Sequence, residues 1–145
     1  MRRRAGTDLQ VARLGLDWAR VIAPFAYAPT TVPELEFHLR GHVESLYDAL
    51  LRQPFQPDAG YSAGVALVVL HMTKPEAIEA SHIFLADRLL TDLDLDPAAH
   101  QPHLIRLLAA FAHGYARALS QRARSDQEAM FRAALLATGR SRQPG

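Results

Sequence analysis

Apolar residues recur every three or four positions along most of this 145-residue chain, which is the spacing of amphipathic helices. No segment shows the alternation of apolar and polar residues that marks a half-buried strand. The pattern predicts five helices, with expected starting points near Asp8, Thr31, Asp58, Thr73 and Asp96. We therefore expect an all-α fold, a bundle of about five helices with a long C-terminal helix that extends from the core.

The second predicted helix has the clearest start. Thr31 and Glu34 have capping-box spacing, in which the threonine hydroxyl accepts from a first-turn amide and the glutamate reaches back to the threonine N–H. Pro33 is tolerated there because first-turn N–H groups have no helical partner. The predicted core stripe of this helix is Leu35, Leu39, Val43, Leu46 and Leu50.

Three other segments are expected to supply core residues. The stripe of the first helix comprises Val11, Leu14, Trp18, Val21, Ile22 and Phe25. The stripe of the fourth comprises Ile78, His82, Leu85 and Leu89. The third helix is apolar all round from Ala63 to Leu70, which predicts a central position in which Gly64 allows a close neighbour. Its valine-rich run also fits a buried strand, and the pattern leaves this alternative open.

The chain changes character along its last proline-free stretch, residues 103–138. Residues up to Leu119 are expected to be buried on most sides, whereas residues 120–128 are mostly polar. A helix that begins in a core and ends outside it is typical of a connector. Ser125 and Glu128 also have capping-box spacing, so a separate short helix is the alternative to one continuous helix.

These patterns divide the chain into four expected parts. Residues 8–119 form the helical sensory or regulatory domain, and residues 120–138 form a helical connector. Residues 1–7, which include three arginines, are expected to be disordered, and residues 139–145, rich in glycine, serine and proline, are expected to be frayed. The polar residues that follow the arginines leave no uninterrupted apolar region of the kind a signal peptide needs.

Composition excludes several classes of function. The formal charge of +1 arises from 16 basic and 15 acidic residues, so no basic field attracts nucleic acid or an anionic membrane. The absence of cysteine excludes disulfide frameworks and thiol chemistry. The longest apolar run, residues 63–70, is far shorter than the ~20 residues that cross a bilayer. We expect a cytoplasmic protein that binds neither nucleic acid nor a membrane.

Seven histidines are the only chemically suggestive set in the sequence. His38 and His42 have the i, i+4 spacing of two metal ligands on a helix, but they lack the glutamate that marks a zinc-protease helix. The chain also contains no glycine-rich phosphate loop and no nucleophile elbow. We therefore expect neither an enzyme nor a metal site in this segment.

Two histidines are expected to lie in the core. His71 ends the apolar third helix, and His82 interrupts the apolar stripe of the fourth. Because a buried polar group needs a hydrogen-bond partner, each is expected to be satisfied by the protein or, alternatively, by a bound molecule. The residues expected to line such a ligand or haem pocket are His71, His82, Tyr61, Met72 and Tyr115. The sequence identifies no cofactor.

Seven phrases stand out together in chain order: Pro33-Glu34-Leu35, Gln53-Pro54-Phe55, Gly64-Val65-Ala66-Leu67-Val68 before His71, Pro75-Glu76-Ala77, Asp87-Arg88-Leu89-Leu90, Gly114-Tyr115-Ala116-Arg117-Ala118-Leu119, and Gln127-Glu128-Ala129. With them, the segment from Leu9 to Leu136 resembles the N-terminal helical domain of actinobacterial proteins that continue into PAS, GGDEF and EAL modules and turn over cyclic-di-GMP. The chain lacks the catalytic loops of that family. The resemblance implies a regulatory module upstream of an enzyme.

The leading hypothesis is a sensory or regulatory domain that relays a signal through its C-terminal helix to a downstream PAS, GGDEF or EAL output. We expect a homodimer, because weak apolar seams favour the pairing of two chains. Its expected contact residues are Tyr115, Leu119, Met130, Ala134 and Ala137. Two alternatives stay open: a globin-like or other helical small-molecule or haem sensor, and a stand-alone protein-interaction module.

Overall fold

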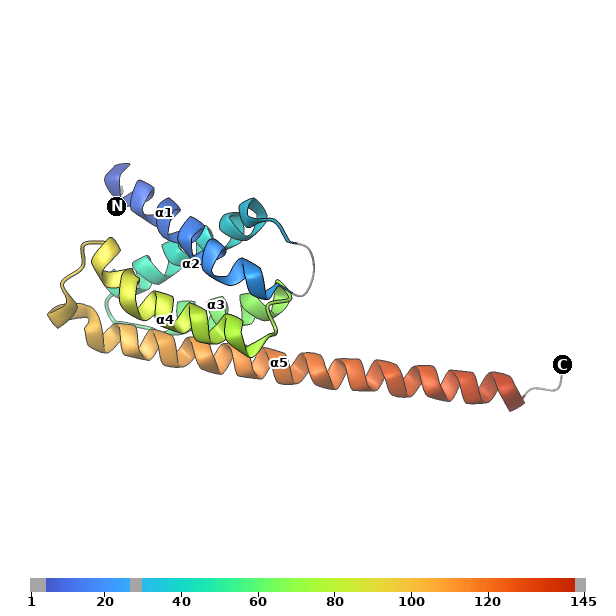
Figure 1. Cartoon of the computed structure of the whole chain (residues 1–145). Helices are drawn as coiled ribbons and strands as arrows, with labels where there is room; N and C mark the ends of the chain where they lie inside the picture. Colours follow the sequence, from blue (N-terminus) through green and yellow to red (C-terminus); the bar gives the residue numbers. More distant parts are fainter. Residues whose placement is uncertain (1–4, 27–29, 143–145) are drawn as a thin grey trace.

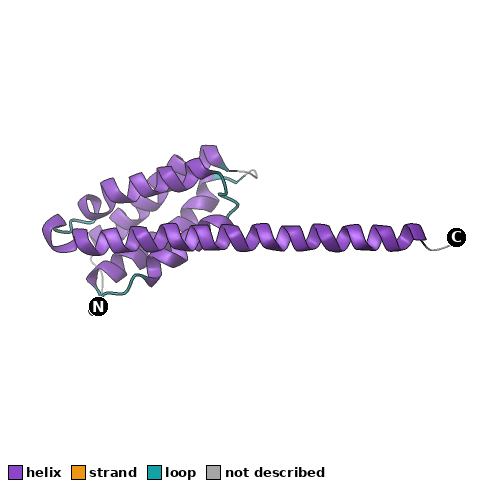
Figure 2. Cartoon of the chain, turned by 90° about the horizontal axis from the view of Figure 1, so that it is seen from below, coloured by secondary structure: helices purple, strands orange, loops and turns teal. Residues whose placement is uncertain are grey.

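The computed structural model describes residues 5–26 and 30–142, and Figure 1 shows a helical bundle built along one half of a long terminal helix. The elements are α1 Ala5–Ile22, the short 3-10 helix η1 Ala23–Phe25, α2 Val32–Leu51, α3 Asp58–Val69, α4 Pro75–Asp92 and α5 Pro97–Arg142. The regular structure within these ranges is all helical (Figure 2). The predicted all-α bundle is therefore confirmed, and the strand alternative for the valine-rich run is wrong.

Helix α2 forms as its sequence predicts. The Thr31 hydroxyl accepts from the Glu34 N–H at 3.3 Å, and the Thr31 N–H donates to the Glu34 carboxylate at 3.3 Å. This reciprocal cap satisfies two amides that would otherwise lack partners, and a cap of this kind contributes about 1 kcal/mol. All residues of the predicted stripe are buried: Leu35, Leu39, Val43, Leu46 and Leu50.

Trp18 joins three helices at the centre of the core. Its ring stacks on Phe84 of α4 with centroids 6.5 Å apart and meets Phe111 of α5 edge-on at 6.3 Å. Its indole N–H donates to the Ser81 hydroxyl at 2.8 Å, so the buried donor is satisfied. The predicted stripe of α1 is confirmed except at Val21, which is 37% exposed.

The predicted stripe of α4 is confirmed except at His82. Leu85 and Leu89 are buried and the partly buried Ile78 packs against the core, whereas His82 is exposed and Ala77 and Ser81 complete the buried face. The cause lies on α1, because the large Trp18 ring needs a small neighbour that also offers a hydrogen-bond acceptor. Serine meets both requirements.

Glycines bring α3 and α5 into backbone contact. A Cβ added at Gly60 would lie 2.2 Å from the Leu107 carbonyl oxygen, and one at Gly64 would lie 2.1 Å from the Phe111 oxygen. From the other helix, a Cβ at Gly114 would lie 2.2 Å from the Tyr61 oxygen. No residue other than glycine fits such an approach. The close contact predicted for Gly64 is confirmed, and Gly60 and Gly114 make equally close contacts that the sequence pattern does not predict.

Helix α3 was expected to be buried on all sides, but one of its sides is exposed. Ala63, Leu67 and Val68 are buried, but Val69 is 69% exposed. Because the glycines allow one face of α3 to pack closely against α5, the opposite face is exposed to solvent. An all-round apolar sequence therefore does not require an all-round buried helix.

Helix α5 is one continuous helix of 46 residues, which packs along the bundle and then projects beyond it (Figures 1 and 2). It passes through Pro102 and through Ser125 without a break. Pro102 lies early in the helix, where its missing N–H leaves only one carbonyl near the exposed end without an intrahelical partner. The continuity of this helix is confirmed, and the alternative of a separate short helix is wrong.

Helical structure extends further at both ends than we predicted. The structure places Ala5, Gly6 and Thr7 in α1, and residues 139–142 in α5. The remaining residues of the expected disordered ends, 1–4 and 143–145, lie outside the described ranges.

The outer side of α5 contradicts the expected burial up to Leu119. Leu104, Leu107, Leu108, Phe111 and Tyr115 are buried against the bundle. Ile105 is nevertheless 58% exposed, and Ala109, Ala112 and Ala116 are also exposed. This happens because α5 lies at the edge of the bundle (Figure 1), so that only one side of it meets other helices.

Candidate functional site: the junction where the terminal helix leaves the bundle

The corner between α3 and α4 lies beside α5 at the point where α5 leaves the bundle. Helix α3 ends in a Schellman motif: the Met72 N–H donates to the Leu67 carbonyl at 2.8 Å, and the His71 N–H donates to the Val68 carbonyl at 3.0 Å. His71 occupies the left-handed position, with φ 63°, that glycine usually takes in this motif. The corner is therefore tight and its backbone is strained.

Tyr115 of α5 binds this corner from within the core. Its ring is buried, and its hydroxyl donates to the Met72 carbonyl at 3.1 Å and lies 3.5 Å from the Lys74 carbonyl. Burial, and then the negative charge of Glu76, raise the pKa of the Tyr115 hydroxyl. The hydroxyl thus keeps its proton at neutral pH and remains a donor.

Arg122 of α5 binds the same corner from the surface. Its Nη1 donates to the Val68 carbonyl at 3.0 Å, and its Nη2 lies 2.8 Å from Nδ1 of His71. Because a guanidinium can only donate, Nδ1 must accept, which places the proton of a neutral His71 ring on Nε2. A cation at the C-terminal end of α3 is also favoured by the helix dipole.

Tyr115 and Arg122 together form what we call the α5 clamp. They stand seven residues apart, which is two helical turns, so both side chains reach the same side of α5. Leu119 lies between them and packs against the core. Beyond Arg122, residues 123–139 are all exposed. The clamp is therefore the place where the supported half of α5 ends and the projecting half begins.

The structure brings three of the five predicted pocket residues to this junction. Met72 is fully buried and offers its carbonyl to Tyr115, while His71 meets Arg122 on the surface. Tyr61 lies half-buried on α3, where its ring meets His113 of α5 edge-on at 5.5 Å. His82 is exposed on α4. The expectation that His71 and His82 are core histidines is wrong, since both are exposed.

Two further histidines, His38 and His42, lie near each other on α2, and a third, His103 of α5, lies against an aromatic ring. Burial, and then the neighbouring His38, lower the pKa of His42 on α2. His103 stacks on Phe55 with ring centroids 4.2 Å apart, and the Arg106 guanidinium lies over the Phe55 ring, 5.0 Å from its centroid. Among the described residues, no group of three or more histidine or acidic side chains could hold a metal ion.

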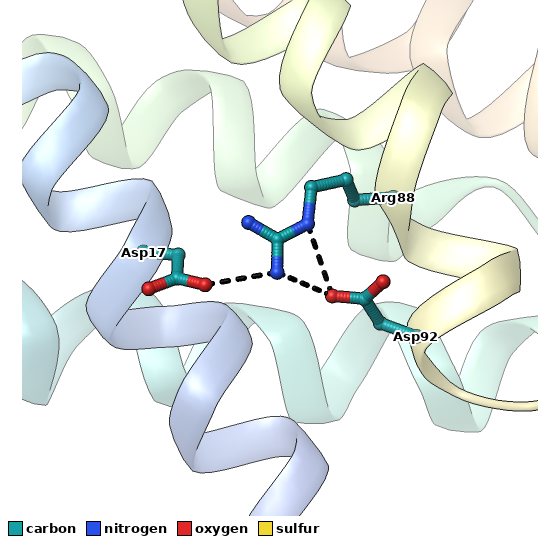
Figure 3. A network of polar contacts seen from close by, with 3 residues as sticks. All are labelled: Asp17, Arg88 and Asp92. Carbon is teal, nitrogen blue, oxygen red and sulfur yellow. Dashed lines mark hydrogen bonds and ion pairs between the residues drawn. The ribbon is translucent and has the colours of Figure 1, made fainter.

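A polar network that the sequence did not indicate connects α1 to α4 (Figure 3). Arg88 Nη2 contacts a carboxylate oxygen of Asp17 at 2.8 Å and one of Asp92 at 2.6 Å, and Arg88 Nε donates to Asp92 at 3.0 Å. Hydrogen bonding to Asp92 is the largest of the causes that raise the pKa of Arg88. Both carboxylates are engaged by one cation, so the arrangement is that of a structural tie between helices.

Comparison of the chain with family models, curated proteins and solved structures gives no match. Within the described ranges, no helix combines the length and the apolar character needed to cross a membrane. The functional proposal therefore rests on the contacts of α5 with the corner between α3 and α4.

Proposed function

We propose that this chain is a non-catalytic regulatory domain of a bacterial signal-transduction protein, in which α5 relays a conformational change to a downstream output. One observation carries the proposal: the last side chain that ties α5 to the bundle, Arg122, binds a strained corner between two other helices. The resemblance to GGDEF and EAL signalling proteins favours an output module of the PAS, GGDEF or EAL type. A cytoplasmic location follows from that role.

The relay works through the backbone of the corner. Any change that shifts α3 relative to α4 displaces the carbonyls of Val68 and Met72, to which the clamp is bound. A hydrogen bond of this kind contributes about 1 kcal/mol, and one from a charged donor somewhat more. Typical couplings between distant sites are of the same size, about 1–3 kcal/mol. The clamp is thus strong enough to transmit a regulatory signal and weak enough to be reversed.

A second copy is part of this proposal. Met130 is 72% exposed, and Ala134 and Ala137 are exposed beside it on the projecting half of α5. Leu119 is packed against the core on one side and partly exposed on the other. These residues offer apolar surface to another helix. Tyr115 does not, because its ring is buried and its hydroxyl is bound to the corner, so the expectation of Tyr115 at a dimer contact is wrong.

Hydrogen exchange with two matched variants tests the relay. Arg122→Ala removes the surface half of the clamp, and we expect amide exchange to rise roughly threefold to tenfold both in the corner at residues 70–74 and in α5 around residues 119–126. Arg124→Ala removes an exposed arginine two residues further on and is expected to change neither region. A rise confined to α5, with the corner unaffected, would show that the two regions are not coupled.

A further inference from the structure

The outer side of α5 carries a continuous apolar stripe that the bundle leaves uncovered. In the half that packs on the bundle, the stripe consists of the exposed residues Ile105, Ala109, Ala112 and Ala116. It continues through Leu119 at the end of that half and through Ala123, Met130, Ala133 and Ala137 in the projecting half. The stripe lies on a flank of α5, roughly a quarter turn around the helix from the core-facing residues, and Leu119 is the member that also packs against the core.

The spacing of this stripe is that of a coiled-coil seam. From Ile105 to Ala137 its positions alternate by four and three residues, and nine of the ten positions are apolar. The exception is Asp126. Heptad spacing sustained over more than four heptads marks helices that pair along their length, because a strict seven-residue repeat keeps one seam facing the partner. We call these ten positions the outer seam.

The projecting half of α5 gives an independent reason for a partner. Phe131 is 66% exposed, and Leu135 and Leu136 are exposed about one turn further along the helix. A helix draws most of its stability from packing of an apolar face, and no described residue of the bundle covers this part of α5. Large apolar side chains gathered at the end of an unsupported helix are typical of an association surface.

We propose that the outer seam pairs with the outer seam of a second copy, in parallel and in register. The proposal rests on the relay function, because a relay to two output modules requires both C-termini to point the same way. The seam is self-complementary in this orientation, since Ile105, Leu119 and Met130 each meet their own counterpart and the alanines between them let the helices approach closely. Ala134, which we expected at the contact, lies one position beside the seam.

The size of the seam predicts a reversible dimer. At about 1.5 Å per residue the seam is about 50 Å long, and a strip about 10 Å wide covers about 500 Å² on each copy. The total of about 1,000 Å² is at the lower limit for a specific interface. Asp126 weakens the pair further, because parallel pairing brings two carboxylates to one level of the seam. A polar residue at such a position fixes register at a cost in stability, which suits a regulated contact.

Single cysteines test the proposal, because the natural chain contains none. Ala112→Cys and Ala137→Cys lie on the seam at opposite ends, whereas Gln121→Cys lies on the same helix away from it. We expect disulfide-linked dimers to form under mild oxidation in each seam variant alone and to be at least tenfold less abundant in the Gln121→Cys control. Crosslinks that form only when the two seam variants are mixed would show antiparallel pairing and overturn the proposal. Seam variants that crosslink no more than the Gln121→Cys control would also overturn it.

Sedimentation equilibrium supplies the second measurement. Asp126→Leu removes the carboxylate pair, and we expect it to tighten dimerisation at least tenfold, whereas Ala116→Glu is expected to weaken it at least tenfold. Unchanged association in both variants would contradict the seam. The relay is tested separately by amide hydrogen exchange at residues 70–74 in the Arg122→Ala variant. A chain that is monomeric but shows coupled exchange would overturn the seam alone, and a crosslinked chain without coupling would overturn the relay alone.

Discussion

The two halves of α5 belong to one helix but are stabilised in different ways. The half up to Leu119 buries Leu104, Phe111 and Tyr115 and has glycine-mediated contact with α3. The projecting half exposes Met130 and its neighbours, and it is helical by continuity with the supported half. Nucleation is the costly step in helix formation, and the supported half supplies the nucleus for the whole helix. One helix therefore forms part of the core along one half and projects from the bundle along the other, and the clamp marks the boundary between the two halves.

The largest expected effect comes from placing one methyl group in each half. In the supported half, Gly114→Ala would place a Cβ 2.2 Å from the Tyr61 carbonyl oxygen, so the helices must separate. We expect it to lower the free energy of unfolding by at least about 3 kcal/mol. Gly139→Ala, with open space around it, should leave the bundle unchanged or raise helicity slightly. Urea unfolding followed by fluorescence of Trp18, the single tryptophan, measures both. Equal effects would contradict the difference between the halves.

An intermediate effect is expected from the polar contact at the centre of the bundle. Ser81→Ala leaves the buried Trp18 N–H without its acceptor, and we expect a loss of about 1–3 kcal/mol in the free energy of unfolding. Ser45→Ala is the matched control, because the Ser45 hydroxyl donates to the Gly41 carbonyl on the exposed side of α2 and its loss should cost less than about 0.5 kcal/mol. If Ser81→Ala and Ser45→Ala lowered the free energy of unfolding equally, the hydrogen bond from Trp18 to Ser81 would contribute no more to stability than an exposed one.

The smallest effect is expected from the protonation of His42. Burial and the neighbouring His38 lower the pKa of His42 in the folded chain. The unfolded chain therefore binds the proton more tightly, so the contribution of His42 to stability is complete above the unfolded pKa of about 6.5 and is lost as the pH falls below it. Thermal unfolding at pH 7.5 and pH 5.5 measures the loss. His42→Gln should reduce the loss of thermal stability between pH 7.5 and pH 5.5. If the variant loses as much stability as the parent chain, groups other than His42 cause the loss.

The parts of the fold that depend on local chemistry were predictable. The cap at Thr31 and Glu34, the stripe of α2 and the continuity of α5 follow from residues that lie near one another in the sequence. The burial of Ser81 and the exposure of His82 on α4 were not predictable in this way. They depend on Trp18, which lies 63 residues away from Ser81 in the sequence and donates to its hydroxyl.

The candidate site was predictable only in part. Met72, His71 and Tyr115 were singled out, and the structure brings them to one junction, but their contacts are with the backbone and with Arg122. The Schellman motif carries no sequence signal here, since His71 occupies the position that usually shows a glycine. The sequence alone does not separate the outer seam that we propose from the core-facing side, because most of its positions are alanine in a mostly apolar helix. Alanine buries too little surface to indicate which side of a helix meets the bundle.

The distance between the bundle and the end of α5 tests the central claim most directly. Spin labels on cysteines at Gly41, on the exposed side of α2, and at Ala137 report this distance within one chain when labelled protein is diluted with unlabelled protein. We predict one narrow distance distribution in the parent chain, a clearly broader one when Tyr115→Phe and Arg122→Ala are combined, and no change with Arg124→Ala. A distribution that is broad in the parent chain, or that is unaffected by loss of the clamp, would contradict the account.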